Sequence, residues 1–484
     1  MSPHRTDSLH ANVTSVERLM KIKFLGAARQ VTGSCYLLNG EGIKILVDCG
    51  LFQERQYSYR NWERFPVPPD QIDYVILTHV HLDHSGLIPK LVREGFSGRI
   101  LLTPASRAMF PIVMMDSARV QEEDAAFKKK RHTKEGREGP YAEIPLYTVH
   151  DVDRCLPLLD DASYGECVQL NDSVKVCFHD AGHILGSAMV EIIVQDESGR
   201  RNIVFSGDIG QYDNPLLNDP TAFKQADYVV MESTYGNRNH EGSQHVDDKL
   251  CDIVSNTVRI GGNILIPTFA IERAQELLYH FGRLTRAHCM PHVSMFLDSP
   301  MAVEITRVFE HYKKCLDDET RALFEKGGSP FEFPQLKLVE SVEESKSIDQ
   351  FKGPVVIMSG SGMITGGRIK HHLARNITSP KSTLLFVGYQ AVGTLGRSIL
   401  DGVSPIRIHG QSYPVRIRIE KIEGFSAHAG MDDLKRWLDS FASPPRRVFL
   451  THGEEESISS LANYISSKDG WRVTAPQHLE EFEI

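Results

Sequence analysis

Three histidines and one aspartate lie within six residues of this chain, and this run constrains the fold more than any other feature. The residues are His79, His81, Asp83 and His84, in the segment THVHLDHSG (78–86). An apolar segment, residues 74–77, precedes them and small residues follow, which predicts a strand that ends in a tight loop. Imidazoles and carboxylates are ligands that zinc prefers. Two histidines two residues apart can bind one ion, and the adjacent Asp–His pair can bind a second.

Further candidate ligands follow apolar strand patterns elsewhere in the chain. Each of these patterns stops at a polar residue with glycine nearby, so that the backbone can turn there. A sandwich of two sheets flanked by helices would gather such strand ends along one edge. A chance cluster of surface histidines would not explain the recurrence. These further candidates are Asp48, His183, Asp208 and His452.

The order of these motifs resembles the metallo-β-lactamase superfamily. Asp48 matches its first motif, residues 79–84 match the second, and His183 and Asp208 match the third and fourth. The resemblance implies an α/β fold, the αββα sandwich, with a site for two zinc ions. Oxygen-reducing diiron relatives carry glutamate at the position of His81, so the resemblance disfavours redox chemistry.

A second set of motifs resembles one branch of that superfamily. Asp208 and His452 are 244 positions apart, which leaves room for another domain between them. Glu232, His428 and His452 resemble motifs A, B and C of the β-CASP nucleases, in which a cap domain is inserted into the sandwich. This group includes ribonuclease J and the pre-mRNA 3′-end cleavage endonuclease. A histidine at motif C resembles the RNA-processing members, whereas DNA-repair members carry an apolar residue there.

The resemblance implies a role for each site residue. The implied ligands of one zinc are His79, His81 and His183. The implied ligands of the other zinc are Asp83, His84 and His452, and Asp208 would bridge the two ions. Asp48 would orient a ligand from behind, and the same ligands also suit manganese. His428, oriented by Glu232, would protonate the leaving oxygen, so the implied catalytic residues are Asp208, Glu232 and His428.

A glycine-rich segment in the predicted cap carries further candidates. A strand pattern at 354–358 leads into SGSGM (359–363) and then into a helical pattern at 368–375. Accessible backbone N–H groups and a helix N-terminus attract phosphates. The alternative is an ordinary strand-to-helix turn. The predicted RNA phosphate ligands are Ser359, Ser361, Thr365 and Arg368.

The patterns along the chain predict four segments. They are a polar leader (1–18), the first part of the metallo-β-lactamase domain (19–236), the cap (237–412) and the C-terminal part of the first domain (413–484). Helical and strand patterns alternate in the cap, which predicts a parallel sheet with crossover helices. We expect the strand pattern at 415–422 to return the chain to the first domain.

Composition restricts the alternatives further. The net charge of −9 means that RNA would have to bind in a local groove. The basic run at 128–132 is interpreted as a solvated linker between helices, with a basic rim of the RNA channel as the alternative. No apolar run reaches the roughly 18 residues of a membrane span. The eight cysteines form no C-x-x-C pair, which indicates reduced thiols and a cytoplasmic protein.

The predicted function is zinc-dependent hydrolysis of phosphodiester bonds in single-stranded RNA, in RNA processing or decay. Endonucleolytic and 5′-to-3′ exonucleolytic cleavage are both compatible with one such site. The alternatives are a DNA nuclease of the same fold, a small-molecule ester or thioester hydrolase, and a non-catalytic scaffold. The sequence is compatible with a homodimer as well as a monomer.

Overall fold

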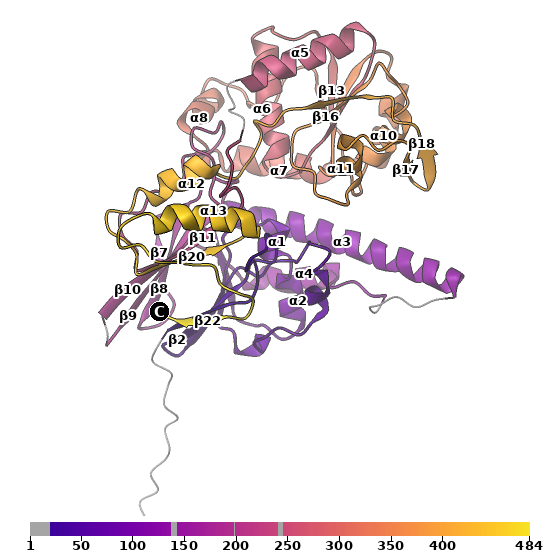
Figure 1. Cartoon of the computed structure of the whole chain (residues 1–484). Coiled ribbons are helices and arrows are strands. Elements are labelled where there is room, and N and C mark those ends of the chain that lie inside the picture. The colour runs from indigo at the N-terminus through magenta and orange to yellow at the C-terminus, as the bar shows by residue number, and fades with distance from the viewer. Residues whose placement is uncertain (1–19, 137–142, 198, 241–244) are drawn as a thin grey trace, which may run out of the picture.

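A computed structural model describes residues 20–136, 143–197, 199–240 and 245–484 of the chain, so the predicted leader at 1–18 lies outside the described residues. A two-sheet sandwich forms the lower part of the molecule in the view of Figure 1, and a smaller α/β domain, the cap, lies above it. Within the described ranges, no helix is both long and apolar enough to cross a membrane.

The first sheet of the sandwich has the strand order β22-β1-β2-β3-β4-β5-β6. Strands β3 to β6 run parallel to one another, and β1 pairs antiparallel with both β2 and β22. The C-terminal segment therefore closes the edge of a sheet that begins at the N-terminus. The bounds are β1 Lys21–Phe24, β2 Tyr36–Gly40, β3 Ile43–Val47, β4 Tyr74–Ile76, β5 Arg99–Leu102, β6 Leu159–Asp161 and β22 Glu481–Glu483.

The second sheet has the order β21-β20-β11-β10-β9-β8-β7. Strands β7 to β10 are antiparallel neighbours, whereas β10, β11, β20 and β21 are parallel. Strand β20 thus returns to the sandwich after the cap and lies beside β11, the last strand before it. The bounds are β7 Cys167–Gln169, β8 Val174–Asp180, β9 Ala188–Asp196, β10 Gly199–Phe205, β11 Tyr228–Glu232, β20 Arg447–Thr451 and β21 Val473–Thr474.

The two sheets enclose a core of large apolar side chains. Phe24 from the first sheet and Phe449 from the second are both buried, and their ring centroids lie 5.1 Å apart. Phe482 of the edge strand β22 packs against Phe449 at 5.0 Å. Because side chains alternate between the two faces of a strand, the residues between these positions face the helices outside.

Helices cover both outer faces of the sandwich (Figure 1), which completes the predicted αββα layers. The N-terminus of helix α3 contacts the loop between β8 and β9. The hydroxyls of Thr103 and Ser106 donate to the Gly186 carbonyl in that loop, at 2.6 and 2.9 Å. The helices of the first sheet are α1 Leu82–Ser85, α2 Ile88–Arg93, α3 Pro104–Glu135 and α4 Val149–Cys155. Those of the second are α12 Met431–Leu438 and α13 Glu455–Ser466.

The cap contains a parallel sheet, as predicted, with the order β14-β13-β15-β12-β16-β19. Its strands are β12 Ile264–Pro267, β13 Ser294–Asp298, β14 Leu336–Leu338, β15 Val355–Ser359, β16 Thr383–Phe386 and β19 Arg418–Lys421. Its helices are α5 Val246–Arg259, α6 Arg273–Arg286, α7 Pro300–His311, α8 Asp318–Glu325, α9 Val342–Ser347, α10 Ile369–Asn376 and α11 Leu395–Leu400. A hairpin of β17 Ile406–Ile408 and β18 Gln411–Tyr413 completes it.

One strand lies in a different domain from the one predicted. We expected the pattern at 415–422 to begin the return to the first domain, but β19 pairs with β16 as an edge strand of the cap sheet. Its apolar alternation fits an edge strand of either domain, so the pattern alone could not assign it. The chain therefore leaves the cap after Lys421, and the other segment boundaries stay predictions.

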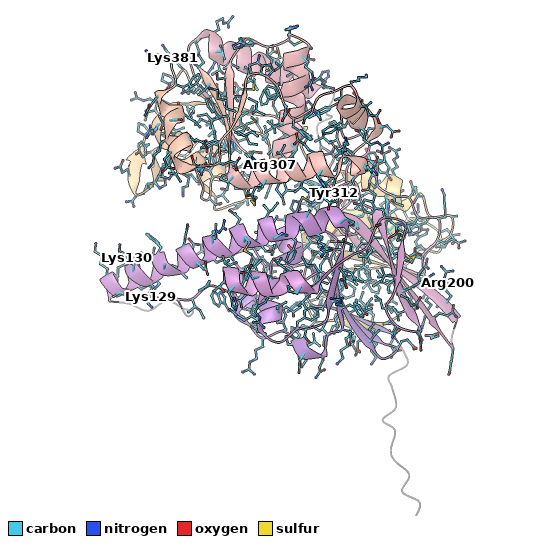
Figure 2. All side chains as sticks on the ribbon, turned by 180° about the vertical axis from the view of Figure 1, so that it is seen from behind. Lys129, Lys130, Arg200, Arg307, Tyr312 and Lys381 are labelled. Atoms are coloured by element: carbon cyan, nitrogen blue, oxygen red, sulfur yellow. A yellow bond between two sulfur atoms is a disulfide. The ribbon has the colours of Figure 1, made fainter. Side chains whose placement is uncertain are left out.

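The basic run at 128–132 is not the predicted linker. It belongs to the outer end of α3, which extends away from the sandwich below the cap. Figure 2 shows Lys129 and Lys130 at that end. The helical pattern therefore continues through the charged run, because lysine and arginine are good helix formers.

The prediction that all thiols are reduced is also wrong for one pair. Cys167 of β7 and Cys177 of β8 form a disulfide across neighbouring antiparallel strands. The other six cysteines are free, and three of them are buried. Spacing along the chain cannot reveal such a pair, because the register of the two strands is what places the cysteines opposite each other.

We expect the contact between the two sheets to dominate the stability of the sandwich. Phe449→Ala should lower the free energy of unfolding by about 3–5 kcal/mol, because it removes a fully buried ring and leaves a cavity. Phe127→Ala is the matched control, because this ring on α3 is 64% exposed and its loss should change stability by about 0.5 kcal/mol or less. Thermal unfolding of both variants measures the difference, and equal midpoints would contradict the assignment.

Candidate metal centre

The candidate ligands come from loops at one edge of the sandwich. In the first sheet, Asp48 follows β3 and the run 78–84 follows β4. In the second sheet, His183 lies between β8 and β9, Asp208 follows β10 and His452 follows β20. The structure therefore brings together residues that the sequence spreads over some 400 positions, because both sheets present these strand ends to the same point.

The first group of ligand atoms consists of three imidazoles and one carboxylate. His79 Nε2 and His183 Nε2 lie 3.1 and 3.2 Å from His81 Nδ1. Both Nε2 atoms also face Asp208 Oδ2, at 3.4 and 3.5 Å. One ligand atom from each of the four residues lies within 4.8 Å of all the others, as a single bound cation requires.

The second group faces the other oxygen of the same carboxylate. His84 Nε2 lies 3.2 Å from Asp208 Oδ1, and His452 Nε2 lies 3.6 Å from it. Asp83 Oδ2 lies 3.4 Å from His452 Nε2. The ligand atoms of Asp83, His84 and His452 also lie within 4.8 Å of one another. Asp208 therefore lies between two ligand sets, with one oxygen towards each.

Two buried atoms at this point have no hydrogen-bond partner among the described residues: Asp208 Oδ1 and His452 Nε2. Leaving such atoms unpaired inside a protein costs about 1–3 kcal/mol each. A divalent cation between them would satisfy both, and the donor set of nitrogen and carboxylate oxygen suits zinc. The residues present therefore fit a pair of zinc ions.

The electrostatics differ between the two ligand sets and favour cation binding in the first. Burial, reinforced by neighbouring imidazoles, holds the pKa of His79 and of His183 well below the ordinary value, and burial lowers the pKa of His81 to about 4. These rings are therefore neutral, which is the form that binds metal. In the second set, burial would lower the pKa of His84 and of His452, but Asp208 and the neighbouring carboxylates outweigh burial and raise both. Burial would raise the pKa of Asp208, but the surrounding imidazoles, His452 and His84 first, outweigh burial and hold it well below its usual range.

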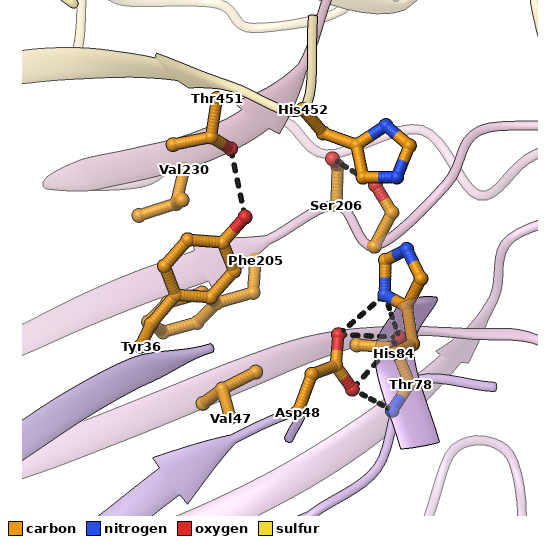
Figure 3. A pocket seen from close by; sticks show the side chains of 11 residues that line it. Tyr36, Val47, Asp48, Thr78, His84, Phe205, Ser206, Val230, Thr451 and His452 are labelled. Carbon is orange, nitrogen blue, oxygen red and sulfur yellow. Dashed lines mark hydrogen bonds and ion pairs between the residues drawn. The ribbon is translucent and has the colours of Figure 1, made fainter. Parts of the chain in front are cut away.

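Asp48 is not among these ligand sets but contacts one of them. His84 Nδ1 donates to Asp48 Oδ2 at 2.7 Å, and the backbone N–H of Thr78 donates to Asp48 Oδ1 at 2.8 Å. Figure 3 shows these contacts at the wall of a small cavity behind His84 and His452. The contact with Asp48 holds the His84 ring with Nε2 towards the centre, and the orienting role of Asp48 stays a prediction.

Two other imidazoles are oriented in the same way. His183 Nδ1 donates to the Ala427 carbonyl at 3.1 Å, and Thr234 Oγ1 lies 3.0 Å from His452 Nδ1. Each contact leaves Nε2 directed at the centre. Thr78 and Thr234 were not among the predicted site residues, although Thr78 directly precedes His79 and Thr234 lies two residues after Glu232. Spacing along the chain does not show which neighbours contact a ligand.

Glu232 and His428 form a pair beside the centre. His428 Nδ1 donates to Glu232 Oε2 at 3.1 Å, and His428 Nε2 lies 3.9 Å from Asp208 Oδ2. The His428 side chain keeps 23% of its surface exposed, whereas Glu232 is buried. Burial alone would lower the pKa of His428, but Glu232 and Asp208 outweigh it and raise this pKa to about 9. A protonated imidazole therefore faces both the centre and solvent.

The four predicted phosphate ligands of the cap differ in burial and in their hydrogen-bond partners. Ser359 is fully buried and donates to the Asp298 carbonyl, and Arg368 pairs with the Asp298 carboxylate at 2.7 Å. These partners argue against phosphate binding by either side chain. Ser361 and Thr365 lie with their hydroxyls 3.1 Å apart in the loop after β15, and their role stays a prediction.

An unusual residue that sequence reasoning missed lies where the cap meets the sandwich. Glu272 has a backbone φ of +62°, is 2% exposed, and neither carboxylate oxygen has a hydrogen bond of ordinary geometry. Burial raises its pKa well above the ordinary value, the Glu276 carboxylate raises it further, and the nearby Leu185 N–H lowers it in part. Strain and an unpaired buried group together mark the segment before α6 as a place where stability is given up.

Three family models match this chain. The metallo-beta-lactamase superfamily model matches residues 28–235, and the Beta-Casp domain model matches residues 274–399. A model described as the Zn-dependent metallo-hydrolase RNA specificity domain matches residues 412–476. Together these matches cover both the sandwich and the cap.

Curated relatives agree with the family models. Ribonuclease TTHA0252 of Thermus thermophilus is 38% identical over 92% of this chain and 96% of its own length. The transcription termination factors FttA of Methanosarcina mazei and Methanocaldococcus jannaschii are 32% and 29% identical, over 73% and 72% of their own lengths.

Among solved structures, a protein described as of unknown function from Enterococcus faecalis V583 superimposes with a TM-score of 0.53. The two chains are 12% identical, and the match covers 96% of this chain and all of the other. This likeness concerns the fold alone.

We predict that Glu272→Gly stabilises the protein by about 1–3 kcal/mol, because it relieves the left-handed backbone and removes an unpaired buried carboxyl group. His288→Gly, at a φ of +55° in an exposed turn, is the matched control for the backbone contribution alone. Because the folded-state pKa of Glu272 is raised, wild-type stability from this group is present at low pH and is lost as pH rises.

Thermal unfolding over a pH series measures both effects of this prediction. The advantage of Glu272→Gln over the wild type should widen as pH rises above the ordinary glutamate range. A Glu272→Gly protein that unfolds below the wild type at neutral pH would contradict the idea that the native glutamate is strained.

Proposed function

The chain belongs to the β-CASP group of metallo-β-lactamase-fold hydrolases, and from this premise we propose that it is a zinc-dependent ribonuclease acting on single-stranded RNA. The observation that carries the proposal is the convergence of two ligand sets on the two oxygens of Asp208. The Glu232–His428 pair lies beside that point, with the imidazole open to solvent. Bound metal ions would activate water, and an imidazolium beside them would protonate the leaving oxygen.

The proposed ligand assignment uses two ions. His79, His81 and His183 would hold one, and Asp83, His84 and His452 would hold the other. Asp208 would bridge them, and Asp48 would keep His84 in place. A bound pair of zinc ions supplies Lewis-acid activation of water and of the phosphodiester. Manganese could occupy the same ligands, because carboxylates and imidazoles bind both metals.

The chain's own residues would handle the proton and the charge. His428 holds a proton at Nε2, 3.9 Å from Asp208 Oδ2, and would give it to the leaving oxygen. Glu232 accepts from Nδ1 and so keeps the imidazole protonated and correctly turned. The same imidazolium would stabilise the negative charge that develops on the phosphate oxygens.

Two observations support RNA as the substrate. The family model that covers His428 and His452 is described as an RNA specificity domain, and the relative from Thermus thermophilus is named a ribonuclease. A DNA nuclease of the same fold would share the metals and the cap. A small-molecule ester or thioester hydrolase would share the metals but would leave the cap and the Glu232–His428 pair unexplained.

We also propose that the protein acts in the cytoplasm in RNA processing or decay, where its six free cysteines would stay reduced. A homodimer stays a prediction, which the mass of the protein in solution tests. One site supports both endonucleolytic and 5′-to-3′ exonucleolytic cleavage, and the two modes give different product ladders.

The direct test is cleavage of single-stranded RNA labelled at its 5′ end. The wild type should release internal fragments or mononucleotides, a chelator should abolish cleavage, and Asp208→Ala should be inactive because both ligand sets lose their shared carboxylate. Single-stranded DNA of the same sequence and a short ester substrate are the controls for the two rival activities. Equal cleavage of RNA by the wild type and Asp208→Ala would contradict the assignment of this site as the ribonuclease active site.

The role of His428 predicts a pH dependence. A general acid must be protonated, so kcat/KM should fall as pH rises through the pKa of His428, and His428→Ala should lower kcat about 10²–10⁴-fold. Glu232→Gln removes a carboxylate that raises this pKa, so the fall should move to lower pH. Glu191→Gln is the matched control, because Glu191 pairs with His179 on another part of the sandwich. An unmoved alkaline limb in Glu232→Gln would exclude His428 as the acid.

A further inference from the structure

Three loops of the cap lie together at one edge of its parallel sheet. They follow β12, β15 and β16, which are neighbours in that sheet. The carboxyl ends of parallel strands share one edge, and open α/β sheets bind their ligands there. This edge therefore has the position of a binding surface, and its orientation towards the sandwich decides what it could bind.

The loop after β12 contacts the parts of the sandwich that carry the metal centre. Glu272 in that loop lies beside the backbone of Leu185, two residues after the candidate ligand His183. The guanidinium of Arg273 lies 5.4 Å from the ring centroid of Phe425, three residues before His428. Both anchoring contacts are thus made to segments that carry site residues, so the loop borders the metal centre.

Phe269 is the apolar side chain that this loop exposes. It is 41% exposed, although Thr268 and Ala270 on either side of it are buried. A Cβ at Gly362 would lie 2.7 Å from the Phe269 ring, and one at Gly388 would lie 3.5 Å from it. The backbones of the loops after β15 and β16 therefore support the ring, which leaves its remaining surface open to solvent.

Exposure alone does not mark a binding residue, since Phe127 and Phe351 are exposed as well. What distinguishes Phe269 is its place on a loop that the two neighbouring loops of the sheet edge support. Tyr389, next to Gly388 in the third loop, is also exposed, at 53%. Two exposed aromatic side chains thus lie on neighbouring loops at one edge of the sheet. Such flat, rigid rings are the groups on which proteins stack the bases of single-stranded nucleic acids.

We propose that Phe269 is a base-stacking residue, on which one nucleobase of the RNA strand rests at the border of the metal centre. The proposal rests on the proposed function, since it needs an RNA substrate. Stacking places the strand without reading its sequence, because every base has a π-face. Phe269 would therefore act as a positioning residue that sets which phosphodiester lies over the metal centre.

Loss of the Phe269 ring should weaken the binding of single-stranded RNA. In an Asp208→Ala background, which prevents turnover, Phe269→Ala should weaken binding of a short fluorescein-labelled single-stranded RNA about 5- to 150-fold. Phe269→Trp should retain binding, and Phe269→Leu, which keeps apolar bulk without an aromatic face, should not. Phe351→Ala is the matched control, because this ring is 40% exposed and packs on Phe296 in the cap core, away from the three loops.

A second arm separates stacking from a structural role. A set of RNAs is made in which each member has one abasic nucleotide at a different position. With Phe269 intact in the Asp208→Ala background, loss of the base should weaken binding at one position only. That position should be silent in Phe269→Ala, because the same contact cannot be lost twice. A disturbed loop would instead weaken binding of every RNA and leave the abasic profile unchanged.

The results separate base stacking on Phe269 from the proposed ribonuclease activity. If the wild type cleaves RNA but Phe269→Ala binds as tightly as Phe351→Ala, stacking is excluded and the ribonuclease assignment stays. If the abasic profile is the same with and without the ring, stacking is excluded as well. If the wild type neither binds nor cleaves RNA, both proposals fall.

Discussion

The carboxylate of Asp208 is the point on which the rest of the site depends. It is buried, and each of its two oxygens faces a different set of ligand atoms. A buried carboxylate stays ionised only where positive charge surrounds it, and here imidazoles supply part of that charge. The loops that deliver them must therefore meet around one short side chain. This requirement explains why strands of both sheets end at the same edge, and why Gly210 has no room for a Cβ, which would lie 1.8 Å from the Gly182 carbonyl oxygen.

The cap completes this arrangement without contributing a metal ligand. Its parallel sheet presents its carboxyl edge to the sandwich, as substrate-binding α/β sheets do. The segment before α6 is held there at some cost, because Glu272 is strained and unpaired. Strain of this kind persists only where the surrounding structure enforces it. The contact between cap and sandwich therefore does not have maximal stability at this segment.

The candidate ligands can be recognised in the sequence because each follows an apolar strand pattern, and the structure brings them together at one edge of the sandwich. The sequence predicts their division between two ions only through family resemblance, since spacing does not show which side chains meet in space. The same limit explains the errors. The register that joins Cys167 to Cys177 and the sheet to which β19 belongs both depend on contacts between distant segments. The helical state of the basic run in α3 is hard to predict for a local reason, because a run of charges is compatible with a loop and with an exposed helix.

The wide spacing of the ligands has a consequence for the biosynthesis of the protein. Asp208 and His452 are 244 positions apart. At the usual rate of synthesis of about 5–20 residues per second, the last ligand follows Asp208 by about 10–50 s. During that interval the nascent chain carries one complete set of imidazoles but only part of the other. A polypeptide being made beside messenger RNA thus cannot assemble its second metal position until the whole cap has been synthesised.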